Sequence, residues 1–475
     1  MSIPWRKFGA TKIATLVIGT LVILLIGLWI TWGFPVGTID YATQPIASNT
    51  DNDPSAASTG IASSTENDLP SKPIVTHLPT PDPLKAVYIT ACTASERRLR
   101  DKVVSLFSGS ELNAIIIDIK DYTGTLAYSS STLRTGRTGN GCVIIDLPEF
   151  LHKLHEKGIY TIARVTVFQD PLYAEEHPES AIKKVSNPQA LWRDPKGLAY
   201  IDPGAVPFWD YIVNISKEAY SIGFDEINYD YIRFPSDGDL KDMKLLPEDN
   251  RPVHVSVAAS ISTPTSASTS GSFLGAATTT SAGQKINTGQ RILSYETSKS
   301  RIITEFFKYL KEHMADTPVK LSADLFGLTT SAESDLGIGQ ILENALPYFD
   351  YVCPMVYPSH FAYGFIGIPR PATKPYEVIS YSMSHAIMKV DAASSTPSKL
   401  RPWLQAFDLG AVYTPAMVEA EKQAVYDSGL SSWSLWNAGS IYTSAELAPA
   451  TKMVTYKNAS TSAEISASTA TTTVR

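Results

Sequence analysis

The chain has 475 residues, of which 44% are hydrophobic and 18% charged, and this allows one large folded domain with additional tails. The formal net charge of −7 is small for this length and no basic run is present, so nucleic acid is not expected as a partner. The three cysteines form no CxxC pair and no Cys/His ligand spacing, so a zinc site has no support.

The N-terminal region predicts a membrane anchor. Residues 1–12 carry Arg6, Lys7 and Lys12, and residues 13–34 form the uncharged run IATLVIGTLVILLIGLWITWGF. Such a run is about long enough to cross a ~30 Å hydrocarbon core. Because the positive charges precede it, the N-terminus should lie inside and the rest of the chain outside the cytoplasm. A cleaved signal peptide is the alternative, although its apolar region normally spans only ~7–15 residues.

Three segments rich in Ser, Thr, Ala and Pro lack the apolar periodicity of folded elements. They are residues 35–84, about 250–290 and 448–475. This composition predicts a disordered linker, a low-complexity insertion and a tail. The insertion follows an apolar run at 224–234, where a loop could form a lid, but its composition favours a flexible surface excursion.

Residues 85–447 contain short apolar runs that predict eight β-strands. The runs are KAVYIT (85–90), NAIIIDIK (113–120), YTIARVTVF (160–168), FDEINYDYIRF (224–234), VKLSADLFG (319–327), DYVCPMVYP (350–358), RPWLQAF (401–407) and LSSWSLWNAG (430–439). Amphipathic helical segments lie between most of them. Strands that are apolar on both faces and alternate with helices predict a (β/α)8 TIM barrel. A doubly wound sheet is the alternative, but no Gly-rich phosphate turn follows the first strand.

Polar residues late in these strands indicate a site at the barrel mouth. Side chains alternate along a strand, and barrel active sites lie at the carboxyl ends of the strands. In the fourth run, Asn228 and Asp230 should therefore face inward near the top, with Glu226 deeper and in need of a partner. The other inward residues expected at the mouth are Asp118, Lys120, Arg164, Asp324, Tyr357, Gln405 and Trp436.

Each candidate has a structural alternative. Lys120 and Arg164 could simply neutralise buried carboxylates, because an unpaired buried charge is costly. Tyr357 and Trp436 could belong to the barrel core. Arg233, just after the strand, could pair with an acidic residue of the next loop as easily as contact a ligand.

Asp230 and Asp324 are expected at the tops of adjacent strands in a mouth lined by aromatic residues. Glycoside hydrolysis needs such a pair, with one carboxylic acid to protonate the leaving oxygen and one carboxylate to attack or to activate water. The eight runs contain no histidine, which disfavours a metal-dependent hydrolase. No cofactor is implied.

Several motifs in order resemble one known family. GFDEINYDYIRFPSDG (223–238), with IIIDIKDYTG, ARVTVFQDP, LSADLFG, CPMVYPSHF, PWLQAF and SLWNAG, is similar to the bacterial family called the "putative glycosyl hydrolase domain". The resemblance runs from about Lys85 to Leu447 and implies a (β/α)8 barrel that acts on polysaccharide. Asp230 matches an aspartate that related barrel glycosidases carry at the end of strand four. The pairing with Asp324 does not come from the resemblance, and Asp118 is the alternative second carboxylate.

The sequence thus predicts a membrane-anchored, extracytoplasmic glycoside hydrolase acting on a cell-envelope or extracellular polysaccharide. Asp230 would be the nucleophile or base, and Asp324 the general acid with a pKa raised by burial. The residues expected to bind substrate are Asp118, Lys120, Arg164, Asn228, Arg233, Tyr357, Gln405 and Trp436. The alternative function is a carbohydrate-binding barrel without turnover. Outside the cytoplasm a Cys92–Cys142 disulfide is conceivable, with buried free thiols as the alternative.

Overall fold

The computed structural model describes residues 75–130, 142–246 and 297–448, all within the unit Ser71–Arg475. The predicted anchor at 13–34, the insertion at about 250–290 and the tail after residue 448 lie outside the described residues. Within these described ranges, the helices are too short or too polar to span a membrane.

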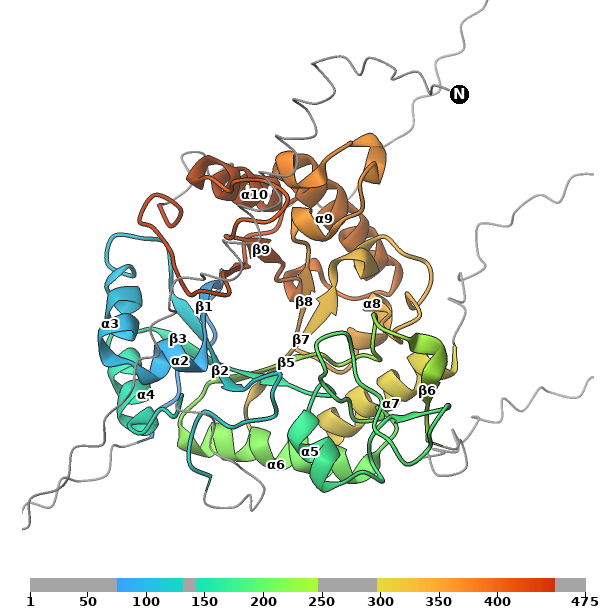
Figure 1. Ribbon diagram of the computed structural model, residues 1–475. Helices are drawn as coiled ribbons and strands as arrows, with labels where there is room; N and C mark the ends of the chain where they lie inside the picture. The colour runs from blue at the N-terminus through green and yellow to red at the C-terminus, as the bar shows by residue number, and fades with distance from the viewer. Residues whose placement is uncertain (1–74, 131–141, 247–296, 449–475) are drawn as a thin grey trace, which may run out of the picture. The chain divides into compact units, whose positions relative to one another are not determined.

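Eight parallel strands close into a barrel in the order β1-β10-β9-β8-β7-β5-β3-β2 (Figure 1). Every barrel strand lies within one of the predicted runs, which confirms the predicted barrel. The strands are β1 (Lys85–Ile89), β2 (Ala114–Lys120), β3 (Tyr160–Thr166), β5 (Glu226–Asp230), β7 (Lys320–Phe326), β8 (Tyr351–Met355), β9 (Trp403–Gln405) and β10 (Trp433–Trp436).

Helices surround the barrel, as the segments between the strands predicted (Figure 1). The longer helices are α3 (Arg97–Ser105), α4 (Leu147–Glu156), α6 (Val206–Ile222), α7 (Ser298–His313), α9 (Pro375–Ala392) and α10 (Pro415–Asp427). The shorter ones are α2 (Ala91–Ser95), α5 (Pro171–Glu176), α8 (Leu342–Ala345) and the 3-10 turns η1 (Leu240–Asp242), η3 (Gly327–Thr330), η4 (Pro358–His360), η5 (Phe365–Gly367), η6 (Pro371–Thr373) and η7 (Pro397–Lys399). Thr297 caps α7 by accepting a hydrogen bond from the Ser300 amide, and Gly223, with φ +128°, ends α6.

Alternation along the strands separates two layers of core. On β5, Ile227 and Tyr229 face the helices, and the Tyr229 hydroxyl lies 2.8 Å from Ser216 Oγ of α6. The opposite face contributes to the barrel interior, where apolar residues of other strands such as Ile116 and Ile162 pack together. Burial on both faces stabilises the barrel by roughly 25 cal/mol per Å² of apolar surface.

Residues 75–84, which were predicted as part of the linker, pack against the barrel near the start of β5. In residues 75–84, the Leu78 amide donates to Asp225 Oδ1 at 2.7 Å, and Leu84 is fully buried. Asp225 Oδ2 also accepts from the Thr161 amide at 2.8 Å. The folded body therefore begins earlier than Lys85, and Asp225 has a structural role at the start of its strand.

A second, two-stranded antiparallel sheet was not predicted. It pairs β4 (Lys183–Lys184) with β6 (Met243–Lys244), from the segments that follow β3 and β5. Each strand has only two residues, which is too short for alternation to show in the sequence. Trp192 is buried in a small cluster beside this sheet, and Tyr231 packs against that cluster.

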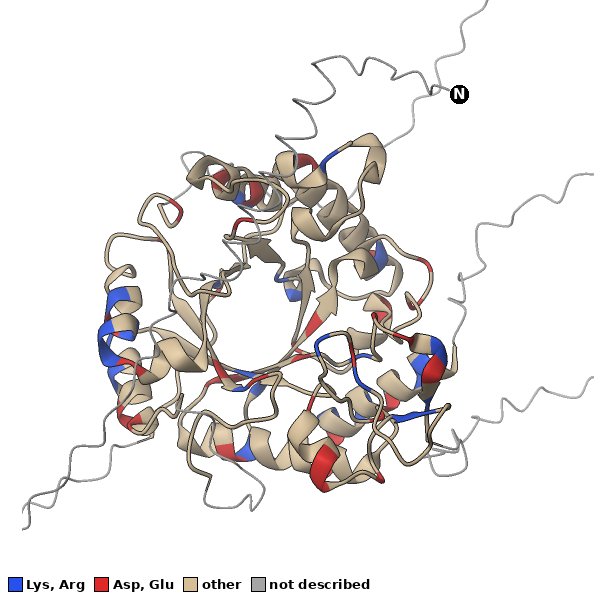
Figure 2. Ribbon diagram, viewed as in Figure 1, with Lys and Arg blue, Asp and Glu red and all other residues tan. Residues whose placement is uncertain are grey.

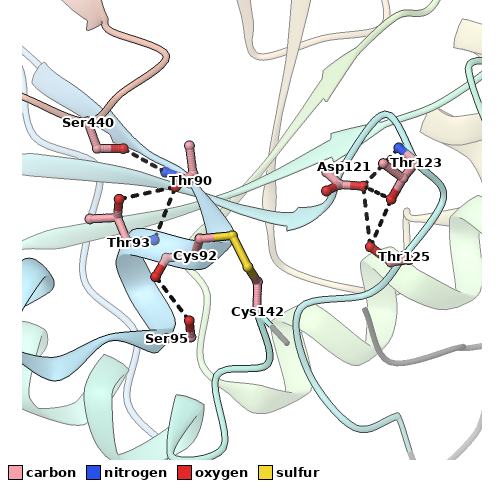
Figure 3. The surroundings of a disulfide bond; sticks show 9 residues. All are labelled: Thr90, Cys92, Thr93, Ser95, Asp121, Thr123, Thr125, Cys142 and Ser440. Carbon is pink, nitrogen blue, oxygen red and sulfur yellow. Dashed lines mark hydrogen bonds between the residues drawn. A yellow bond between two sulfur atoms is a disulfide. The ribbon is translucent and has the colours of Figure 1, made fainter. Parts of the chain in front are cut away.

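A disulfide joins Cys92 of α2 to Cys142 (Figure 3), so the alternative of free thiols is wrong for this pair. Cys353 is a buried free cysteine. Near the disulfide, Asp121 Oδ1 accepts a hydrogen bond from the Thr123 amide at 2.9 Å and closes the turn after β2. Cys142 comes later in the chain than this turn. The disulfide therefore links the segment before α4 to α2, the helix that follows β1.

We expect the double variant Cys92→Ser, Cys142→Ser to lose about 2–4 kcal/mol of unfolding free energy, because the disulfide constrains the unfolded chain. The two cysteines are 50 residues apart in the sequence, so the closed loop is long. Denaturant titration with and without reductant provides the measurement. Reductant should destabilise the wild type and leave the double variant unchanged, and equal responses of both proteins would contradict a stabilising disulfide.

Candidate active site

A cavity of about 270 Å³ lies at the carboxyl ends of the strands. Its position follows from its lining, which includes the last residues of four barrel strands: Asp230, Phe326, Met355 and Trp436. The full lining is Arg164, Asp230, Tyr231, Arg233, Asp324, Phe326, Gly327, Leu328, Met355, Tyr357, His360, Phe361 and Trp436. Figure 2 shows charged residues on the outer helices and also on strands around the barrel.

Asp230 ends β5 with its side chain on the predicted inward face and lines the cavity. Its Oδ1 accepts from the Tyr231 amide at 2.6 Å, and its Oδ2 forms an ion pair with Arg164 Nη2. Tyr231 adopts φ +53°, a left-handed conformation that is uncommon for a residue other than glycine. Backbone and side chain together therefore fix the carboxylate at the cavity edge.

Asp324 comes from the neighbouring strand β7 and is 1% exposed. Its Oδ1 accepts from Asn228 Nδ2 at 2.8 Å and from Trp403 Nε1 at 2.7 Å, while its Oδ2 lies 3.9 Å from Arg164 Nε. Burial raises the pKa of Asp324 well above its ordinary value, and the nearby charge of Asp230 raises it further. The two carboxylates thus share one cavity but differ in their environments.

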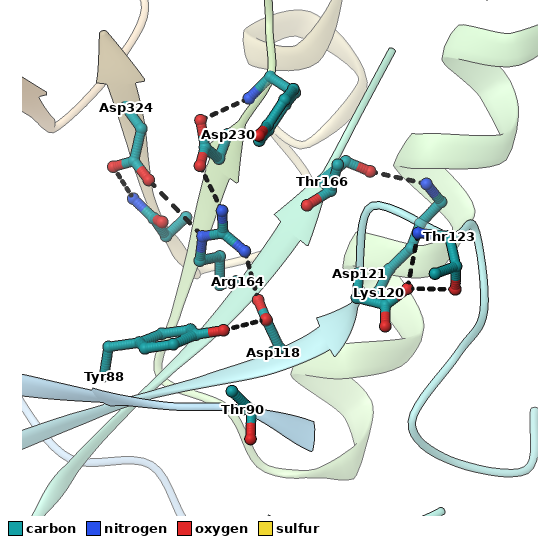
Figure 4. Close-up of polar contacts among 12 residues, drawn as sticks. Tyr88, Thr90, Asp118, Lys120, Asp121, Thr123, Arg164, Thr166, Asp230 and Asp324 are labelled. Atoms are coloured by element: carbon teal, nitrogen blue, oxygen red, sulfur yellow. Dashed lines mark hydrogen bonds and ion pairs between the residues drawn. The ribbon is translucent and has the colours of Figure 1, made fainter. Parts of the chain in front are cut away.

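Arg164 of β3 connects the carboxylates of three strands (Figure 4). Its guanidinium forms ion pairs with Asp118, Asp230 and Asp324. One buried cation cannot neutralise three buried carboxylates, and this imbalance favours protonation of at least one of them. Although burial disfavours its charge, Asp118 and Asp230 hold the pKa of Arg164 above its ordinary value.

Asp118 faces inward but does not line the cavity. It accepts hydrogen bonds from Arg164 and from the Tyr88 hydroxyl, and burial raises its pKa. The Tyr88 ring in turn stacks on Trp436, with centroids 3.9 Å apart. Asp118 therefore holds Arg164 and Tyr88 in place without lining the cavity itself. Asp324 does line the cavity, so it is better placed than Asp118 to act together with Asp230.

Aromatic side chains from several strands surround the two acids. Tyr357 and Trp436 line the cavity, as predicted, and Trp403 packs edge-on against Trp436 at 5.6 Å between ring centroids. The Tyr357 hydroxyl has no hydrogen-bond partner among the described residues. A polar group with open capacity next to two carboxylates can bind a ligand hydroxyl.

Residues 86–442 match the family described as "Putative glycosyl hydrolase domain". The chain belongs to this family. The fold is similar to that of the PgaB (BpsB) glycoside hydrolase domain from Bordetella bronchiseptica, with 12% identity, a TM-score of 0.51, and coverage of 75% of this chain and 94% of that one. Comparison with curated proteins gives no match.

Two further solved structures are similar to parts of this chain. A hypothetical protein from Ruminiclostridium thermocellum is 29% identical, with a TM-score of 0.36, and covers 50% of this chain and 96% of its own. A chitinase from Chromobacterium violaceum is 11% identical, with a TM-score of 0.41 and coverage of 77% of this chain and 97% of its own. The family match confirms the resemblance inferred from the motifs.

In this member of the glycosyl hydrolase domain family, Lys120 does not reach the site, contrary to the prediction. The pairing of β2 with β3 shifts register between Asp118 and Lys120, so that Lys120 aligns with Val165 on the outward face. Its Nζ donates to the Thr166 carbonyl at 2.6 Å (Figure 4). The same Nζ forms an ion pair with Asp170 at 2.8 Å. A β-bulge adds one residue to the strand, so the residues after it point to the opposite face from the one that strict alternation predicts. For this reason the prediction that Lys120 faces inward was wrong.

Two other predicted contact residues lie behind the cavity. Asn228 holds Asp324 through the hydrogen bond described above and also donates to Ser322 Oγ at 3.1 Å. Gln405 is fully buried, where its Oε1 accepts from the Ser359 amide at 3.1 Å. Both residues position parts of the site, and neither lines the cavity.

Several residues of the site were missed in the sequence. Tyr88 and Trp403 lie on the inward faces of their strands, and alternation within KAVYIT and RPWLQAF could have identified them. His360 and Phe361 line the cavity from the turn η4 after β8, where no periodicity exists to reveal them. Burial lowers the pKa of His360 and favours its neutral form.

In the described part of the chain, no group of three or more His, Cys, Asp or Glu side chains could hold a metal ion.

Proposed function

We propose that the protein is a glycoside hydrolase that acts on a cell-envelope or extracellular polysaccharide. One observation carries this proposal: Asp230 and Asp324, from adjacent strands, share one cavity at the carboxyl end of the barrel in different electrostatic environments. When two carboxyl groups have different pKa values because their environments differ, one can act as the acid and the other as the base at the same pH. The family match supports the same class of reaction.

The environments suggest a role for each acid. Asp324 is buried with a raised pKa, so it can hold a proton and donate it to the leaving oxygen. Asp230 forms an ion pair with Arg164 and lines the cavity, where its carboxylate could attack the sugar or activate water. Tyr357 and Trp436 would contact the sugar, and the apolar faces of sugar rings suit such aromatic walls.

We further propose that the barrel lies outside the cytoplasm, anchored by residues 13–34. The Cys92–Cys142 disulfide supports an oxidising compartment. The uncharged N-terminal run preceded by Arg6, Lys7 and Lys12 supports the orientation.

The function is tested by incubating the full-length chain with a panel of envelope polysaccharides and measuring new reducing ends. The wild type should release products, and kcat should fall as the pH rises through the raised pKa of Asp324, because the general acid then loses its proton. Asp324→Asn should be slow on polysaccharide. With an aryl glycoside that carries an activated leaving group, its rate should lack this alkaline decline.

The same alkaline decline in wild type and Asp324→Asn would remove Asp324 as the general acid. Binding without release of product by the wild type would favour the non-catalytic carbohydrate-binding barrel instead.

A further inference from the structure

Arg233 is a buried cation in the cavity, and no carboxylate of the described residues forms an ion pair with it. It follows Asp230 by three residues, lines the same cavity and is 9% exposed. Its Nη1 donates to the Phe234 carbonyl at 3.1 Å and to Ser236 Oγ at 3.2 Å, and its guanidinium lies over the Tyr231 ring at 4.8 Å. These contacts hold the side chain in place, but within residues 75–130, 142–246 and 297–448 none of them supplies a negative charge.

The other buried cations of the described residues differ from Arg233 in this respect. Each of them has a carboxylate oxygen within 4.0 Å: Lys85, Arg100, Lys120, Arg164, Arg401 and Lys422. A buried charge without a partner is costly, and proteins normally pair it. Among the described residues, Arg233 is the exception, and it lines the cavity. A ligand bound there could supply the negative charge that balances it.

Nearby carboxylates are already engaged or face solvent. Asp230 contacts Arg164 and the Tyr231 amide. Asp194 accepts from Gln169 Nε2 at 3.1 Å and from backbone amides, while Asp237 is exposed. Among the described residues, none of these acids comes within ion-pair distance of Arg233.

The free edge of the guanidinium suits a planar anion. Nε and Nη2 have no hydrogen-bond partner within the described ranges. These two N–H groups lie along one edge and form a fork that matches both oxygens of a carboxylate. Neutral sugar hydroxyls would not balance the charge.

We propose that Arg233 forms a carboxylate-binding subsite beside Asp230, so that the polysaccharide bears an acidic sugar next to the bond that is cleaved. This inference rests on the proposed function and narrows its substrate to polysaccharides that contain uronic acids or similar carboxylated sugars. His360, neutral in its buried position, adds no competing positive charge to the subsite.

The test compares binding of polymers with and without carboxylates. Full-length Asp230→Asn protein, which should cleave substrate far more slowly than the wild type, is titrated with hyaluronan, alginate and polygalacturonate and with the carboxyl-reduced form of each. At least one native polymer should bind about 10- to 100-fold more tightly than its reduced form. Adding Arg233→Gln should remove this preference, and Arg233→Lys should restore only part of it because a lysine lacks the fork.

Arg193→Gln is the matched control, because Arg193 is an exposed arginine outside the cavity that pairs with Glu175. It should leave the preference unchanged. Arg233→Gln should also be at least as stable as the parent protein in thermal unfolding, since it removes a buried charge that no described carboxylate pairs. A large loss of stability would instead assign Arg233 a structural role and overturn the subsite.

Equal binding of native and carboxyl-reduced polymers throughout the panel would overturn the inference, as would a preference that survives Arg233→Gln. Tighter binding of dextran sulfate than of every carboxylated polymer would replace the carboxylate with a sulfate and overturn this assignment. A preference for carboxylates without product release by the wild type would refute the hydrolase and leave the subsite standing. Equally fast cleavage of native and reduced polymers by the wild type would refute the carboxylate subsite and leave the proposed hydrolase standing.

Discussion

Replacing Asp230 with Asn is expected to lower kcat for polysaccharide hydrolysis by roughly 100- to 10,000-fold. The amide is nearly the same size as the carboxylate and can still accept the hydrogen bond from the Tyr231 backbone. It can neither attack the sugar nor take a proton from water. Because Arg164 keeps its contacts with Asp118 and Asp324, the fold should remain intact.

The measurement is the release of reducing ends by equal amounts of folded protein. Asp237→Asn is the matched control, since Asp237 belongs to the same motif but is exposed and does not line the cavity. Its activity should equal that of the wild type. Product release by Asp230→Asn at the wild-type rate would exclude Asp230 from the mechanism.

Breaking the buried ion pair between Glu226 and Arg401 is expected to cost about 3–5 kcal/mol of unfolding free energy. Arg401 Nη1 lies 2.9 Å from Glu226 Oε2, and Glu226 is almost fully buried beneath the active site. Tyr160 also donates to this carboxylate at 3.2 Å. Glu226→Gln leaves the arginine charge without a partner in the barrel interior, which is the source of the loss.

Denaturant titration of Glu226→Gln, Arg401→Met and the double variant measures this effect. The double variant should lose less stability than the sum of the single variants, because it leaves neither charge buried alone. Lys217→Met, which breaks an exposed pair with Asp316, should leave the unfolding free energy nearly unchanged. Additive losses in the double variant would show that the two buried charges do not depend on each other.

The four acids of GFDEINYDYIRFPSDG have distinct positions, and alternation predicted those of Glu226 and Asp230. Asp225 is structural, Glu226 lies deep with a cationic partner, Asp230 reaches the cavity and Asp237 is exposed. The prediction succeeded because β5 is regular from Glu226 to Asp230, so parity is preserved along the strand. On β2 the same reasoning failed at Lys120, because a local bulge leaves no mark in the residue pattern.

By itself the sequence determined the barrel and its strands, since short apolar runs that alternate with amphipathic helices favour few other arrangements. It also determined which residues of regular strands face inward, including Asp230 and Asp324. Only the tertiary structure decided which charges meet. The contacts of Arg164 with three carboxylates, and the positions of Arg233 and His360 in the same cavity, depend on distances between segments far apart in the chain. No local pattern encodes those distances.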